Sequence, residues 1–124
     1  MLHRTLLGLL VLATPTLAQS ATRPKIDLRV LVTGVPGSER LKDFHKFLRE
    51  EFRVVGTTSY SDFREQDARD YDVVVFDAEI TPTPGRIGLP KRPDLPRDFA
   101  RASVLVAGGG AILARPLGLK TNWG

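Results

Sequence analysis

Blocks of apolar residues along the chain follow two different periods. Residues 26–33 end in a continuous apolar run, which is typical of a strand buried on both faces of a parallel sheet. In residues 39–52, apolar side chains instead recur every three or four positions, and charged residues fill most positions between them, which predicts an amphipathic helix. The apolar positions of this helix are Leu41, Phe44, Leu48 and Phe52. Ser38, directly before it, is a typical N-cap residue.

Three shorter apolar runs predict further strands, at residues 53–58, 71–77 and 103–107. Asp62 is a candidate cap for a short helix at residues 63–69, and a second short helix is predicted at residues 111–117, interrupted by Pro116. Residues 78–97 contain five prolines, which exclude regular helix and central strand. A loop of this length is uncommon unless it covers a site. We therefore expect it to form a cover.

The alternation of strands with helices predicts the α/β class. Right-handed crossovers between buried strands of this kind build an open parallel sheet. About four strands are predicted, which is few for this architecture. We therefore expect the chain to be the N-terminal part of a longer ancestral domain.

The first residues follow the pattern of an export signal. A short, positively charged start precedes the apolar residues 5–13, and residues 14–18 end in small side chains that suit a signal peptidase. The apolar run is too short to span a bilayer. We predict a signal peptide at residues 1–18, a linker at 19–25 and a folded domain at 26–124, exported to the periplasm or the exterior without a stable membrane anchor.

The chain contains no cysteine, and of its two histidines only His45 lies beyond the predicted signal peptide. Thiolate catalysis, cysteine-bound zinc and iron–sulfur clusters are therefore excluded. A histidine metal cluster or a Ser-His-Asp relay has too few imidazoles. We predict no metal and no cofactor, and we interpret His45 as a surface or boundary residue.

The formal net charge is +4, but Lys and Arg are scattered among Asp and Glu without a basic block. A nucleic-acid-binding surface requires clustered cationic residues. We therefore exclude nucleic acid as a partner. The sequence leaves a homo-oligomer open.

Two groups of polar and glycine residues follow predicted strands, at the ends where open α/β sheets bind ligands. Gly34, Gly37 and Ser38 follow the first strand, where backbone N–H groups could meet a phosphate or carboxylate, although their spacing matches no nucleotide-binding loop. Asp77 and Glu79 end the third strand, where a carboxylate acts as a base or holds a cation. A plain turn and loop capping are the simpler interpretations of the two groups.

The fourth predicted strand leads into Gly108, Gly109 and Gly110. A buried strand, a sharp turn and a helix N-terminus form the arrangement on which hydrolases present a nucleophile. Here Ala107 and the glycines occupy the turn, so no side chain there attacks a substrate. Two explanations stay open: an anion-binding nest of backbone N–H groups, or glycines selected for close backbone packing.

Residues 104–114 (VLVAGGGAILA) resemble the class I glutamine amidotransferase-like superfamily, including its trehalose-utilisation (ThuA-like) relatives and above all its secreted, uncharacterised members. Supporting segments are residues 29–34 (RVLVTG), 71–77 (YDVVVFD) and 117–123 (LGLKTNW). The resemblance implies a flavodoxin-like open sheet with helices on both faces. It places the family's nucleophile at Ala107 or Gly108, neither of which is reactive, so amidotransfer is not carried over.

These observations predict a secreted, catalytically silent amidotransferase-like domain. We expect it to bind a small polar or anionic ligand, or a carbohydrate, at the strand ends, with the loop 78–97 as a cover. One alternative is a hydrolase-like, carbohydrate-processing fragment that uses Asp77 or Glu79. Another is a flavodoxin-like or receiver-like binding domain with Asp77 as phosphoacceptor, although Thr33 and Gly34 stand where a receiver has acidic residues. The third is a remnant without activity of its own.

Overall fold

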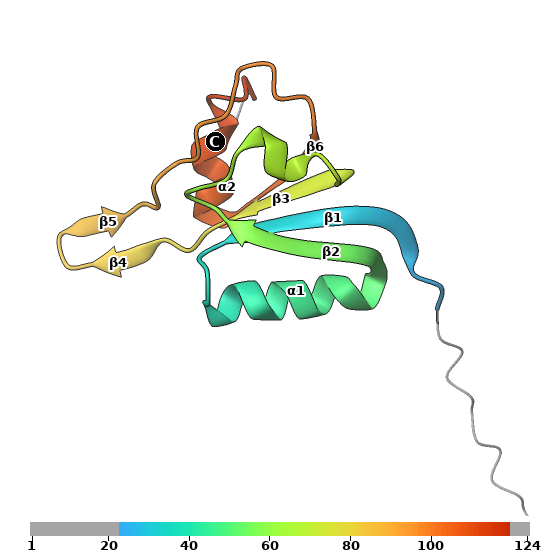
Figure 1. Ribbon diagram of the computed structural model, residues 1–124. Coiled ribbons are helices and arrows are strands. Elements are labelled where there is room, and N and C mark those ends of the chain that lie inside the picture. Colours follow the sequence, from blue (N-terminus) through green and yellow to red (C-terminus); the bar gives the residue numbers. More distant parts are fainter. Residues whose placement is uncertain (1–22, 120–124) are drawn as a thin grey trace, which may run out of the picture.

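Four parallel strands form the central sheet in the order β2-β1-β3-β6 (Figure 1). The computed structural model describes residues 23–119. Strand β1 (Ile26–Gly34) lies between β2 (Phe52–Ser59) and β3 (Val73–Asp77), and β6 (Ala102–Val106) is the edge beyond β3. The predicted α/β class and open parallel sheet are confirmed. Because β1 connects to β2 on one side and β3 stands on the other, the strand order reverses between β1 and β3.

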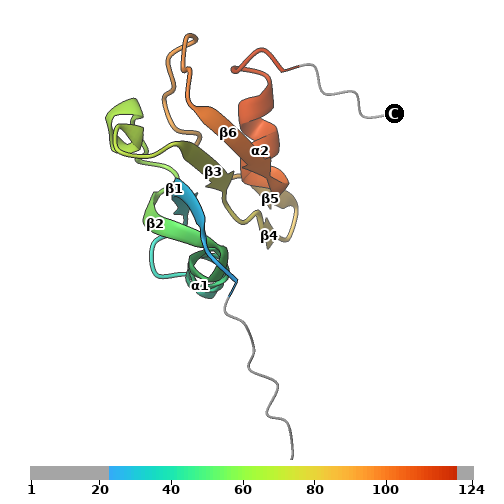
Figure 2. The same ribbon diagram turned by 90° about the vertical axis from the view of Figure 1, so that its right-hand side faces the viewer.

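Helices lie on both faces of this sheet. Helix α1 (Glu39–Glu51) covers one face, whereas α2 (Ala107–Ala114) and the short 3-10 helix η1 (Glu65–Ala68) lie on the other. Figure 2 shows α1 and α2 on opposite sides of the strands. This two-sided cover accounts for the continuous apolar runs in β1 and β3. Successive residues of a strand point to opposite faces of the sheet, and here the residues on both faces are buried.

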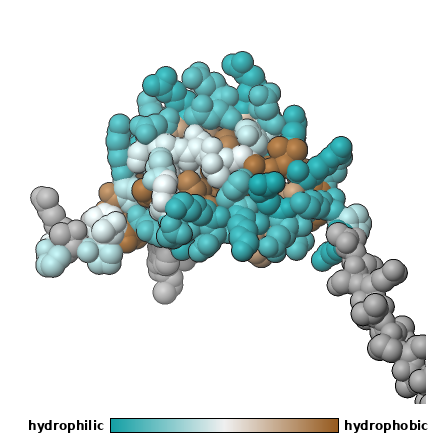
Figure 3. All heavy atoms as spheres, turned by 60° about the horizontal axis from the view of Figure 1, so that its bottom comes forward, coloured by the Kyte–Doolittle hydropathy of each residue, from teal (hydrophilic) through white to brown (hydrophobic). Residues whose placement is uncertain are grey.

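Helix α1 forms as its sequence pattern predicts. The hydroxyl of Ser38 accepts a hydrogen bond from the Leu41 backbone N–H at 3.2 Å, which caps the helix. Leu48 is buried against Val30, Val32 and Val75 of the sheet. The side of the molecule that α1 covers presents mainly hydrophilic side chains, with hydrophobic ones in patches between them (Figure 3).

The opposite face holds the larger core cluster. Phe63, Phe76 and Phe99 pack edge to face, with ring centroids 5.0–6.1 Å apart. Aromatic pairs in this arrangement contribute about 0.5–1.5 kcal/mol each beyond the burial of their area. Because Phe99 comes from the long connection between β3 and β6, the cluster ties this connection to the sheet.

Residues 78–97 differ in part from the irregular loop that the prolines predict. They contain a hairpin of β4 (Thr81–Thr83) and β5 (Arg86–Gly88), which extends away from the sheet in Figure 1. A two-stranded ribbon has only edge strands, so Pro82 is tolerated there. Gly85 takes a positive φ of 77° at the turn, which glycine adopts readily.

Two local predictions were wrong. Helix α2 begins at Ala107, so the glycines lie in its first turns rather than in a turn before a helix at 111–117. Residues 63–69 form only the four-residue η1, in which the Asp67 side chain accepts from the Arg64 backbone N–H in place of a cap at Asp62. In each case tertiary packing or a neighbouring side chain outweighs local propensity.

The predicted signal peptide, residues 19–22 of the predicted linker and Trp123 lie outside the described residues. Within residues 23–119, no helix is long and apolar enough to cross a membrane.

Candidate functional site

The point where the strand order reverses is occupied by an ion pair between α1 and β3. The Arg40 guanidinium, in the first turn of α1, donates two hydrogen bonds to the Asp77 carboxylate, at 2.6 Å from Nε and 2.9 Å from Nη2. The Asp77 side chain is only 3% exposed, and that of Arg40 is 37% exposed. A two-point contact of this kind holds the carboxylate in a fixed orientation.

The surroundings of Asp77 leave it little freedom to act as a base. Its backbone N–H donates to the Thr33 hydroxyl at 3.3 Å, and both of its carboxylate oxygens accept from Arg40. The hydrogen bond to Asp77 raises the pKa of Arg40, and the nearby negative charge of Glu79 raises it further. The carboxylate thus serves chiefly to join the end of β3 to the start of α1.

The structure places Gly34, Gly37 and Ser38 in a plain strand-to-helix turn. The Ser38 hydroxyl is engaged as the N-cap of α1, and Gly37 has a positive φ of 78°. The Gly34 carbonyl accepts from the Tyr60 backbone N–H at 2.8 Å, and a Cβ on Gly34 would lie 2.9 Å from the end of the Leu41 side chain. Every one of these features serves the turn itself, and none of them requires a ligand.

Strand β6 passes into α2 through a sharp turn at Ala107. Val106 is extended, whereas Ala107 takes a positive φ of 50°, a region that costs a non-glycine residue about 1–2 kcal/mol. The strand-turn-helix shape of a nucleophile elbow is therefore present, with a methyl group in place of a reactive atom. Ala107 is exposed, so a side chain here faces solvent.

The glycines after the elbow lie where the backbone of α2 approaches the sheet closely. A Cβ on Gly109 would lie 2.5 Å from the Ala78 backbone nitrogen, and one on Gly110 would lie 2.5 Å from the Leu105 carbonyl carbon. The Gly109 N–H donates to the Ala78 carbonyl at 3.3 Å, and the Gly109 carbonyl accepts from the Tyr60 hydroxyl at 2.6 Å. Close packing against Ala78 and Leu105 therefore explains why glycine occupies positions 109 and 110.

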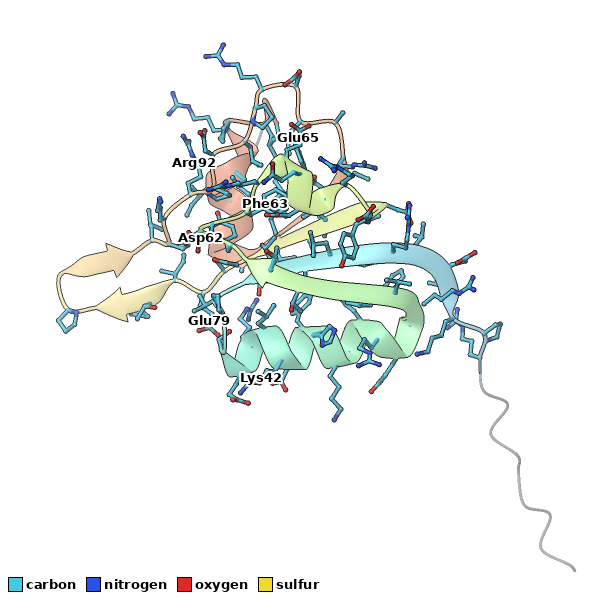
Figure 4. All side chains as sticks on the ribbon, in the orientation of Figure 1. Lys42, Asp62, Phe63, Glu65, Glu79 and Arg92 are labelled. Carbon is cyan, nitrogen blue, oxygen red and sulfur yellow. The ribbon has the colours of Figure 1, made fainter. Side chains whose placement is uncertain are left out.

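Sequence reasoning missed a hollow of about 500 Å³ beyond the carboxyl end of β2. It lies between the segment that follows β2 and the proline-rich connection, and Figure 4 labels three of its residues, Asp62, Phe63 and Arg92. Its charged lining comprises Arg64, Lys91, Arg92, Asp62 and Asp94. The predicted cover formed by residues 78–97 thus contributes side chains of its own.

Three cationic groups face two carboxylates around this hollow, which leaves it electropositive. Among the residues that the structure describes, neither Arg64, Lys91 nor Arg92 forms an ion pair. Asp62 accepts a hydrogen bond from the Ser59 hydroxyl at 2.8 Å. Burial raises the pKa of the neighbouring Tyr60 to about 12, and the positive charge of Arg92 opposes this rise.

Other catalytic sets find no support in the described part of the chain. The only imidazole there, His45, lies within 3.2 Å of the Val55 carbonyl through Nε2, on the far edge of α1 from Asp77. No group of three potential metal ligands occurs within residues 23–119. Comparison of the chain with family models, curated proteins and solved structures finds no match.

Proposed function

We propose that this protein is an exported, non-catalytic α/β domain that binds a small anion in the hollow beyond β2. The observation that carries the proposal is the set of three cationic side chains, Arg64, Lys91 and Arg92, around a cavity of about 500 Å³ without ion-pair partners among residues 23–119. Guanidinium and ammonium groups suit phosphate and carboxylate ligands. The site also lies at the strand ends that open α/β sheets use for binding.

The elbow and the ion pair support the non-catalytic part of this proposal. Ala107 stands at the position where the amidotransferase-like resemblance places a nucleophile. Asp77, the carboxylate of the hydrolase alternative, has both oxygens bonded to Arg40. Glu79 is exposed at the surface. The amidotransferase-like ancestry and the export signal are the parts of the proposal that rest on the sequence pattern.

Inorganic phosphate and citrate are the probes for the first test. Thermal unfolding of the purified protein at low ionic strength should show stabilisation by one of them, and ligand at 100 times its Kd adds about 2.7 kcal/mol. Arg92→Glu should weaken binding at least about tenfold, because a hydrogen bond to a charged group contributes about 1.5–3 kcal/mol.

Arg97→Glu is the matched control, since Arg97 is exposed on the same connection but outside the hollow. It makes the same change of charge and should leave affinity within about threefold, because Arg97 is not one of the residues that line the hollow. If both variants lost the same amount of affinity, the effect would come from the net charge of the protein and not from the hollow. The absence of stabilisation by either probe would refute the proposal.

A further inference from the structure

An apolar groove runs beside α1 on the face of the sheet opposite α2. Its volume is about 350 Å³. Phe44 and Leu48 of α1 form one wall. The remainder is lined by residues of the sheet: Leu28 and Val30 of β1, Phe52 of β2, Val73 and Val75 of β3, and Val104 and Val106 of β6. The hollow proposed above as an anion site lies elsewhere and shares none of these residues.

The groove arises because α1 covers only half of its face. The helix packs over β1 and β2, while Val104 in the edge strand β6 stays 48% exposed. Parallel sheets normally have both faces covered, because their strands are apolar on both sides. Val104, together with the partly exposed Val73 and Val106, therefore forms an apolar surface that a covering element would bury.

The edge of α1 that borders the groove is identified by its contacts. Arg40 bonds to Asp77 of β3, whereas His45 bonds to Val55 of β2, so the two edges of the helix face opposite halves of the sheet. Phe47 lies seven residues after Arg40, on the same edge. Its side chain is 60% exposed, which extends the apolar surface of the groove up the side of α1.

Carboxylates follow the same edge. Asp43 and Glu51 flank Phe47 at spacings of four residues, and Glu79 follows β3 close enough to Arg40 to raise the pKa of Arg40. Arg40 is the cation on this edge, and Asp77 already neutralises it. None of these three carboxylates takes part in an ion pair within the described ranges. The rim of the groove is therefore acidic along the edge of α1.

We propose that this groove is the docking site for an amphipathic helix of a partner protein that carries Lys or Arg along one edge of its apolar face. A helix suits the space, because helices are the elements that cover parallel sheets and pack about 8–10 Å from one another. Strand β6 spans roughly 17 Å, the length of about eleven helical residues. The acidic rim sets the charge of the partner's edge.

The test uses two lactam-bridged helical peptides of about fourteen residues, long enough to cover the groove. Both present leucines on one face, and one carries lysines along the edge where the other carries glutamates. Fluorescence anisotropy with the purified protein should show the lysine peptide binding at least about threefold more tightly, which is the combined effect of three exposed ion pairs at the low end of their usual strength. Higher salt should reduce the difference in affinity between the lysine and glutamate peptides, because it screens exposed charges.

Val104→Lys and Val54→Lys form a matched pair of variants. Both valines lie in edge strands and are similarly exposed, at 48% and 43%, but Val54 is not a lining residue of the groove. Val104→Lys should abolish binding of the lysine peptide, and Val54→Lys should preserve it. Circular dichroism of both variants establishes that they are folded.

Three results would overturn the proposal. Neither peptide binds the folded protein; or both bind equally; or Val54→Lys weakens binding as much as Val104→Lys. Sedimentation decides what covers the groove if the peptides fail, because a dimer that Val104→Lys dissociates would assign it to a second copy of this chain.

Discussion

The side chain of Tyr60 takes part in a chain of hydrogen bonds that connects three parts of the molecule. It lies just beyond β2, it is 1% exposed, and its hydroxyl donates to the Gly109 carbonyl in α2 at 2.6 Å. Gly109 in turn donates to the carbonyl of Ala78, just beyond β3. A buried hydroxyl between these segments fixes the distance between the end of β2 and the start of α2. Tyr60 thus belongs to the core of the molecule.

Tyr60→Phe should lower the free energy of unfolding at neutral pH by about 1–3 kcal/mol, since the Gly109 carbonyl loses its partner in a buried site. Burial raises the pKa of Tyr60 from 10.0 to about 12. The unfolded chain therefore releases this proton first, and the wild-type protein should lose stability as the pH rises from about 10 to about 12. The variant should lack this part of the loss.

Denaturant unfolding at pH 7, 10 and 12 measures both the loss at neutral pH and the pH dependence. Lysines titrate in both proteins, so their contribution cancels in the difference in unfolding free energy between the wild type and Tyr60→Phe. Tyr71→Phe controls for the removal of a tyrosine hydroxyl. A wild-type and a Tyr60→Phe protein with the same loss of stability above pH 10 would show that the buried hydroxyl does not ionise as described.

Helix α2 is the element whose boundaries the sequence could least define. Glycine is a poor helix former, so three consecutive glycines predict a turn. The helix nevertheless begins at Ala107, because the backbone of Gly109 and Gly110 fits against Ala78 and Leu105 where no side chain can enter. In contrast, α1 was predicted to within one residue, since its cap and its apolar spacing are local signals.

Gly109→Ala should destabilise the protein by about 1–3 kcal/mol, because its Cβ would overlap backbone atoms of Ala78 that cannot rotate away. Gly108→Ala is the matched control. Its Cβ would meet side-chain atoms of Ile80, Cδ1 and Cγ1, rather than backbone, and Ile80 is 38% exposed. We expect its effect to stay within about 1 kcal/mol, since alanine also favours the helix by about that amount.

Chemical denaturation of the two variants measures this difference. Equal destabilisation by both substitutions would mean that the glycines are needed for backbone conformation in general rather than for the approach of α2 to Ala78. A stable Gly109→Ala protein would contradict the close packing itself.

At the scale of the whole molecule, the sequence predicted the parallel sheet but not its functional surfaces. The apolar runs of β1 and β3 report burial on both faces, and this signal is local. The ion pair of Asp77 has no such local signal, because its partner Arg40 lies 37 residues earlier in the chain. The hollow that we propose as an anion site likewise depends on where the proline-rich connection lies relative to the end of β2.

Strand β6, together with the helix α2 that follows it, should be the part of the central fold that opens most readily. It joins β3 through residues 78–101, a crossover that contains the β4–β5 hairpin but no helix, and β6 pairs with one neighbour only. Strand β2 is also an edge, but its pairing with β1 is longer than that of β6 with β3, and a helix, α1, connects it to β1. Backbone amides of β6 should therefore exchange at least about tenfold faster than those of β2. Native-state hydrogen exchange measures this ratio, and equal protection of the two edges would contradict it.

The crossover through residues 78–101 also affects how the protein can evolve. The sheet fixes the positions where the crossover begins and ends, but each doubling of a loop's length costs only about 0.6 kcal/mol in closure entropy. Insertions and deletions there are thus compatible with the same fold. Because Lys91 and Arg92 of the proposed anion site belong to this segment, changes in the segment would alter the proposed ligand preference while the architecture stays constant.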